Sequence, residues 1–216
     1  IEKIVITSGY VKNILKQLLK LGIRREFIFI PPKSQIEFHL FSDKQVRREA
    51  SAKLYDLMNK FSVNANIVAV GGTALGFVRE GDFLHWDGDI DLFAPLDSKI
   101  ELINFLKSQG YKPNGESGSV MNSIKLDMIL DIGITVPMSV DFFDSSSDVF
   151  TDTFEDYSWE WRTKMFTKCE KVKIHGKSMN VTSPPSEYLS QVYGASWSLP
   201  NPNFNYKDYN GKVNQF

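Results

Sequence analysis

The stretch from Val70 to Phe93 constrains the fold of this chain more than any other part of it. An apolar run at residues 67–70, which favours a β-strand, leads into two adjacent glycines, and three alternating aspartates follow further on. Glycine lets backbone N–H groups approach a phosphate closely, and carboxylates are ligands that Mg²⁺ prefers. This order of features predicts a site for moving a phosphorus-containing group from a nucleotide donor.

The acidic end of the stretch holds Asp87, Asp89 and Asp91. Because residues two apart in a strand point to the same face, Asp89 and Asp91 are predicted to project together. They are predicted to bind Mg²⁺ or Mn²⁺, with Asp87 as an additional metal ligand at the loop edge. An EF-hand is excluded, because its sixth position is Leu92 instead of glycine and its twelfth is Ser98 instead of glutamate.

The glycine end of the stretch is predicted to bind the donor phosphate. Gly71, Gly72 and Thr73 lie at the start of a helix expected over residues 73–79, where the helix dipole favours an anion. Arg79 is predicted to clamp the phosphate with its planar donor fork. Taken singly, a plain glycine turn and a surface arginine are simpler explanations, and only their combination with the aspartates favours a site.

The pattern resembles the nucleotidyltransferase superfamily. Its longer form, GGTALGFVREGDFLHWDGDIDLF, resembles the LicD branch, which includes bacterial phosphocholine transferases and the eukaryotic fukutin-related proteins. Two further segments match in the correct order: residues 140–144, where the family has a strand with a third carboxylate, and residues 183–202, with a proline, a helix, Tyr-Gly and a tryptophan. The resemblance spans residues 50–210, and Gly88 departs from it where the family commonly has aspartate.

The resemblance implies that Asp89 and Asp91 bind the catalytic metal. Asp141 would complete the metal site or act as general base on an acceptor hydroxyl. The implied reaction moves a phospho-alcohol such as phosphocholine from a CDP-linked donor to a hydroxyl of a cell-surface glycan, as in capsule, lipopolysaccharide or teichoic acid synthesis. An NTP-dependent nucleotidyltransferase acting on a small molecule and a non-catalytic glycan-binding module are the alternatives. A bacterial, cytoplasmic protein is expected.

Aromatic residues gather late in the chain, and core packing is the simpler explanation for most of them. A pocket for the acceptor or the headgroup is the functional alternative, since a choline group would be bound by cation–π contacts. Ribitol, glycerol and ethanolamine donors stay open. The candidate pocket residues are Trp159, Trp161, Tyr193 and Trp197.

Composition excludes several classes of protein. The 216 residues carry 25 basic and 26 acidic side chains without a basic run, so nucleic acid is not an expected partner. The single cysteine, Cys169, excludes an intrachain disulfide and a cysteine-rich zinc site. No apolar run approaches the roughly 18 residues that a transmembrane segment needs.

Residues 1–45 are predicted to form a short Rossmann-like βαβ segment, with strands at 3–7 and 27–30 and a helix at 11–21. One such unit does not make a full domain, so it is predicted to be the remnant of a larger Rossmann-like domain in a longer polypeptide. Residues 46–216 are predicted to form an α+β domain of the nucleotidyltransferase type, a mixed sheet flanked by helices. Its expected elements are helices at 44–61, 73–79, 98–109 and 186–193, strands at 66–70, 119–130 and 134–143, and a hairpin at 172–181.

Overall fold

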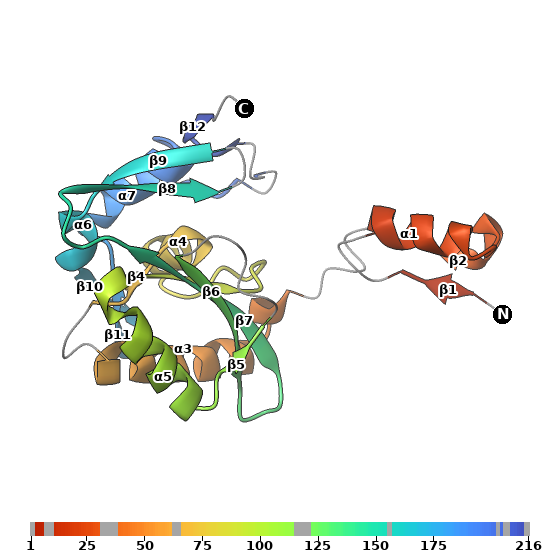
Figure 1. Cartoon of the computed structure of the whole chain (residues 1–216), viewed down its shortest axis with the longest axis horizontal. Helices are drawn as coiled ribbons and strands as arrows, with labels where there is room; N and C mark the ends of the chain where they lie inside the picture. Colours follow the sequence, from red (N-terminus) through yellow and green to blue (C-terminus); the bar gives the residue numbers. More distant parts are fainter. Residues whose placement is uncertain are drawn as a thin grey trace. The chain divides into compact units, whose positions relative to one another are not determined.

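The computed structural model describes residues 3–6, 11–30, 39–61, 66–114, 122–154, 157–201, 204 and 208–213. The chain divides into two compact units, Ile1–His39 and Leu40–Phe216 (Figure 1). None of the helices in the described ranges is long and apolar enough to cross a membrane.

The first unit contains one strand–helix–strand sequence. Strand β1 (Ile4–Val5) pairs in parallel with β2 (Ile28–Phe29), and α1 (Val11–Lys20) lies between them in the chain. Gly22, at φ +78°, follows the helix in the left-handed region that glycine tolerates best. The predicted order of elements is present, and the interpretation as a domain remnant stays a prediction.

The second unit is built on a seven-stranded mixed sheet. Pairs β4–β7 and β11–β3 run parallel, and the other neighbours run antiparallel. The predicted antiparallel pair at 119–130 and 134–143 is found as β6 and β7, although residues 119–121 lie outside the described residues. In spatial order the strands are β10 (Glu170–Ile174), β11 (Lys177–Val181), β3 (Val68–Ala69), β4 (Ile90–Pro95), β7 (Thr135–Phe143), β6 (Ser123–Ile129) and β5 (Lys112–Pro113).

Helices cover both faces of this sheet, as predicted for an α+β domain. In Figure 1, α3 and α5 run along one side of the sheet, and α7 lies on the other side with the C-terminal strands. The helix α4 packs against β4 and α7. The helices of the unit are α3 (Lys44–Phe61), α4 (Gly71–Arg79), α5 (Lys99–Ser108), α6 (Lys164–Thr167) and α7 (Pro185–Tyr193).

The side chains of the central strand β4 alternate between the two faces of the sheet. Ile90 and Leu92 are fully buried on one face, while Asp91 and Phe93 point to the other. Phe93 packs there in an aromatic cluster with Phe143, Phe150 and Phe166, at centroid distances of 5.4–6.5 Å.

That second face is covered by a three-stranded sheet that the sequence patterns did not predict. Its strands are β8 (Val149–Phe154), β9 (Tyr157–Arg162) and β12 (Lys212–Val213), all antiparallel. Phe150 on β8 stacks on Phe143 of β7 at 5.0 Å, which ties this small sheet to the acidic face of the large one.

The boundary between β3 and α4 differs from the prediction. The strand is limited to Val68–Ala69, and the helix begins at Gly71 instead of residue 73. Val70 stays extended, its N–H donates to the carbonyl of Asp91, and its own carbonyl accepts the first helical bond from Ala74. The strand therefore turns into the helix without a connecting loop, which places the glycines beside β4.

Candidate functional site

The glycine turn at the start of α4 lies directly against two carboxylates. Gly71 adopts φ +54°, and a Cβ built on it would stand 3.0 Å from Oδ2 of Asp91. A Cβ on Gly72 would stand only 2.3 Å from Oδ2 of Asp87. Both glycines are therefore required for the acids to approach the helix N-terminus, where the dipole favours negative charge.

Asp91 is held by hydrogen bonds with residues of two other elements. Its backbone N–H donates to the hydroxyl of Thr73 at 3.0 Å, and the Ser139 hydroxyl donates to its Oδ1 at 2.9 Å. Thr73 was predicted to bind the donor phosphate, yet it is 1% exposed. In this structure its side chain positions Asp91.

Asp87 and Asp89 lie just before β4 in the chain. The strand begins at Ile90, one residue after Asp89, and the shared face of Asp89 and Asp91 stays a prediction. Burial, the charge of Asp89 and a hydrogen bond with Asp89 all raise the pKa of Asp87. The backbone of Asp87 is fixed as well, since its carbonyl accepts the N–H of Phe41 at 3.4 Å.

Asp141 lies on the neighbouring strand β7 and faces the same side of the sheet as Asp91. Asp91 pairs with Ser139 and Phe93 pairs with Asp141, so the two acids are one strand and two residues apart. This register puts their Cα atoms about 8 Å apart. Burial raises the pKa of Asp141, against a hydrogen bond from Ser123 and the charge of Lys125, which lower it.

A further acid, Asp152 on β8, was missed by the sequence reasoning. Burial, followed by the charge of Asp141, raises its pKa to about 6. It follows Phe150 by two residues, and Phe150 packs inward against the large sheet. An acid at an inward position of an alternating strand is the sequence signal that could have identified it.

These acids repel one another. Burial and the charges of Asp89, Asp141 and Asp152 raise the pKa of Asp91, while its hydrogen bond from Ser139 lowers it. A bound cation would relieve that repulsion.

The binding of Mg²⁺ or Mn²⁺ stays a prediction. Among the described ranges, no three His, Cys, Asp or Glu side chains gather into a group that could hold a metal ion, so Asp89, Asp91 and Asp141 do not form one ligand set here. Mg²⁺ commonly takes one or two carboxylates and completes its shell with phosphate and water oxygens. The crowded acids over the glycine turn fit that mode, with the Asp89–Asp91 pair as the predicted ligands.

Arg79 lies away from the glycine turn, and its contact with the donor phosphate stays a prediction. It lies at the opposite end of α4 from Gly71, about 12 Å along the helix axis at 1.5 Å per residue. Its guanidinium donates to Glu80 at 2.7 Å and to the carbonyl of Trp197 at 3.3 Å, and it lies 5.8 Å from the Trp86 ring centre. The structure therefore gives Arg79 a role in joining α4 to the C-terminal segment.

Two of the four predicted pocket aromatics are core residues. Trp161 is 1% exposed and packs against Tyr188, and Trp159 is 8% exposed and donates its indole N–H to the carbonyl of Gln191 at 3.3 Å. Little surface of either indole ring is therefore accessible to a ligand. Tyr193 and Trp197 are half-buried, and their part in a pocket stays a prediction.

A tyrosine that was not predicted lies near the acids. Tyr209 packs on Tyr193 with ring centres 5.7 Å apart. Burial and the charges of Asp91, Asp87 and Asp89 raise the pKa of Tyr209 to about 12, so its hydroxyl stays neutral. Aromatic rings therefore border the acids on the side of the C-terminal segment.

The loop that carries Asp87 is fixed by an ion cluster of Arg47, Asp82 and His175. Arg47 Nε donates to Asp82 at 2.8 Å, and His175 Nε2 lies 3.0 Å from the other oxygen of that carboxylate. Arg47 also donates to the carbonyls of Phe41 and Ser42. The cluster thus joins α3, the loop after α4 and the β10–β11 turn, and it sets where the loop enters the site.

We expect the Arg47–Asp82 pair to contribute about 2–3 kcal/mol of coupling energy, because both side chains are largely buried and breaking a buried pair strands a charge. A double-mutant cycle with Arg47→Met and Asp82→Asn, followed by urea denaturation, measures it. The pair Lys53–Asp131, in which the Asp131 side chain is 85% exposed, is the control and should give below about 0.5 kcal/mol. Equal coupling in both pairs would contradict this account.

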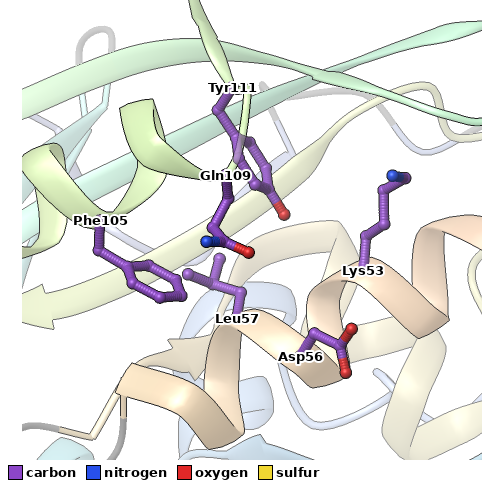
Figure 2. Close-up of a pocket in the computed structure, with 6 residues that line it drawn as sticks. All are labelled: Lys53, Asp56, Leu57, Phe105, Gln109 and Tyr111. Carbon is purple, nitrogen blue, oxygen red and sulfur yellow. The ribbon is translucent and has the colours of Figure 1, made fainter.

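A separate cavity lies between α3 and α5, on the other side of the sheet from Asp91. Its volume is about 90 Å³, below the roughly 300–1,000 Å³ of typical ligand pockets. Figure 2 shows Gln109 and Tyr111 projecting toward Asp56 and Leu57 of α3. It contains none of the predicted site residues, so the glycine turn stays the candidate site. The cavity is lined by Lys53, Asp56, Leu57, Phe105, Gln109 and Tyr111.

A helix that starts at a glycine pair, seated against acidic residues of a mixed sheet, defines a domain of the nucleotidyltransferase type. The family model described as "LicD/FKTN/FKRP, nucleotidyltransferase domain" matches residues 64–183, more than half of the chain. The chain therefore belongs to the LicD family, as its sequence resemblance predicted, and family membership indicates a transferase. No match was found among curated proteins.

Several solved structures are similar to parts of the chain. The lincosamide antibiotic adenylyltransferase LnuA, with lincomycin bound, is 14% identical with a TM-score of 0.45, covering 62% of this chain and 78% of its own. The Cid1 poly(U) polymerase is 20% identical with a TM-score of 0.35, covering 46% and 31%. An antigenic nucleotidyltransferase-like protein from Paracoccidioides brasiliensis is 18% identical with a TM-score of 0.41, covering 63% and 62%.

Proposed function

We propose that this domain transfers a phospho-alcohol from a CDP-linked donor to a hydroxyl of a glycan, releasing CMP. The observation that carries the proposal is the seating of Asp87 and Asp91 over the glycine turn that starts α4. LicD membership supports the choice of phospho-alcohol transfer over other reactions of the superfamily.

The acids would have separate roles in the reaction. Asp89 and Asp91 would hold a divalent cation, Mg²⁺ or Mn²⁺, which supplies charge neutralisation at the donor diphosphate. Asp141 would accept the proton of the attacking hydroxyl, since its raised pKa brings it closer to neutral pH. The hydroxyl oxygen attacks the phosphorus of the phospho-alcohol, and the bond to CMP breaks.

A positively charged headgroup such as choline is the proposed alcohol. Tyr193 and Tyr209 are half-buried and pack on each other with ring centres 5.7 Å apart. The negative charges of Asp87 and Asp91 act on both rings, so a cation placed there would gain from the charges and from cation–π contact.

A donor panel tests the proposal. The protein is incubated with Mg²⁺, glycan acceptors and one of CDP-choline, CDP-ribitol, CDP-glycerol or ATP, and CMP and pyrophosphate release are followed. CMP from CDP-choline, lost in Asp89→Ala, supports the proposal. Pyrophosphate from ATP identifies a nucleotidyltransferase instead. Metal-independent glycan binding that is unchanged in Asp89→Ala identifies a binding module.

A further inference from the structure

Tyr188 of α7 hydrogen-bonds the first residue of the glycine turn. Its hydroxyl accepts the N–H of Gly71 at 2.9 Å, although the two residues are 117 positions apart in the sequence. Gly71 has φ +54°, a backbone conformation that other residues rarely adopt. The bond therefore links the C-terminal helix to the most constrained backbone position of the candidate site.

The hydroxyl has a function that the ring does not. The ring is 3% exposed and packs against Trp161 and Phe166, with ring centres 5.0 and 6.0 Å away. Phenylalanine would fill the same space and keep those contacts. The bond to Gly71 is the contribution of the oxygen alone.

Gly71 lies between Tyr188 and Asp91. Its N–H meets the phenol oxygen, and a Cβ built on it would stand 3.0 Å from Oδ2 of Asp91, so a side chain there would crowd this carboxylate. A shift of this turn would therefore move the N-terminus of α4 relative to the carboxylate.

The phenol can also donate. Because its oxygen accepts the Gly71 N–H, its own proton is available for an acceptor. Burial raises the pKa of Tyr188 and keeps it protonated, and the carboxylates whose charges act on it are Asp152 and Asp91.

We propose that Tyr188 is a positioning residue of this site, holding Gly71 in its left-handed turn and so fixing the start of α4 against Asp91. The effect of Tyr188 on activity rests on the proposed function. Its effect on the Gly71 backbone does not.

Tyr188→Phe tests the proposal, with Tyr111→Phe as the matched control, a buried tyrosine beside the α3–α5 cavity. Hydrogen exchange of the Gly71 amide should accelerate about tenfold or more in Tyr188→Phe, because the N–H loses its acceptor. With the CDP donor, kcat should fall about 10- to 100-fold while KM changes less than about threefold, as expected when alignment and not binding is lost. Tyr111→Phe should change none of these.

Unchanged exchange at Gly71 in Tyr188→Phe overturns the proposal. So does an activity loss in Tyr188→Phe that Tyr111→Phe matches. If the wild-type protein releases CMP from no donor, the proposed function fails, and the exchange at Gly71 still decides the role of Tyr188.

Discussion

Asp91→Asn is expected to lower kcat/KM for CMP release by at least about 10³, because the substitution removes a proposed metal ligand at the centre of the site. The fold should survive, since the asparagine oxygen can still accept the Ser139 hydroxyl that Asp91 accepts at 2.9 Å. Initial rates at saturating Mg²⁺ measure the loss. Asp131→Asn, which removes a carboxylate from the exposed β6–β7 turn, is the control and should retain full activity.

The same variant should be more stable than the wild-type protein in EDTA at pH 8. Burial and neighbouring charges raise the pKa of Asp91 in the folded state. A carboxyl with a raised folded-state pKa binds protons more tightly when folded, so metal-free wild-type protein loses stability as pH rises through that pKa. Thermal melts in EDTA at pH 5 and pH 8 should show the gain of Asp91→Asn at pH 8 and a smaller gain at pH 5. A lower Tm of the variant than of the wild-type protein at pH 8 would contradict the repulsion between Asp91 and its neighbouring acids.

Gly72→Ala is the second large effect that we expect. The new Cβ would stand 2.3 Å from Oδ2 of Asp87, so this carboxylate must leave its position over the helix N-terminus. Activity should fall about 10- to 100-fold, because Asp87 is the additional metal ligand predicted at the loop edge and would be displaced. Stability should change little, because a flexible side chain yields and alanine favours the helix over glycine by about 1 kcal/mol.

Gly88→Ala is the matched control for this substitution. Gly88 adjoins Asp87, yet a Cβ built on it meets nothing within 4 Å. The control should keep near wild-type rates, and steady-state kinetics with urea denaturation of both variants make the comparison. Full activity in Gly72→Ala would show that Asp87 need not lie over the turn.

The part of the site that is local in sequence could be predicted from it. The order of strand, glycine pair, helix and acidic strand is contained in Val70–Phe93, and the structure has this order. The antiparallel pair of β6 and β7, whose alternation and turn are visible in the sequence, is also present, but Asp141 approaches Asp91 through the parallel pairing of β7 with β4.

The remainder depends on pairings between distant segments. Asp152 reaches the acidic face only because β8 packs over β7, and Tyr188 reaches Gly71 only because α7 packs against α4. Local periodicity can mark Asp152 as an inward-facing acid, but it does not show which segment its strand packs against. Arg79 is close to the glycine turn in sequence, yet it lies at the other end of α4.

Transfer of labelled choline from CDP-choline to a glycan, followed together with CMP release, tests the central claim most directly. The account predicts one CMP per choline transferred, dependence on Mg²⁺ or Mn²⁺, and loss of both products in Asp91→Asn. Pyrophosphate release from an NTP without CMP from any CDP-linked donor would contradict it.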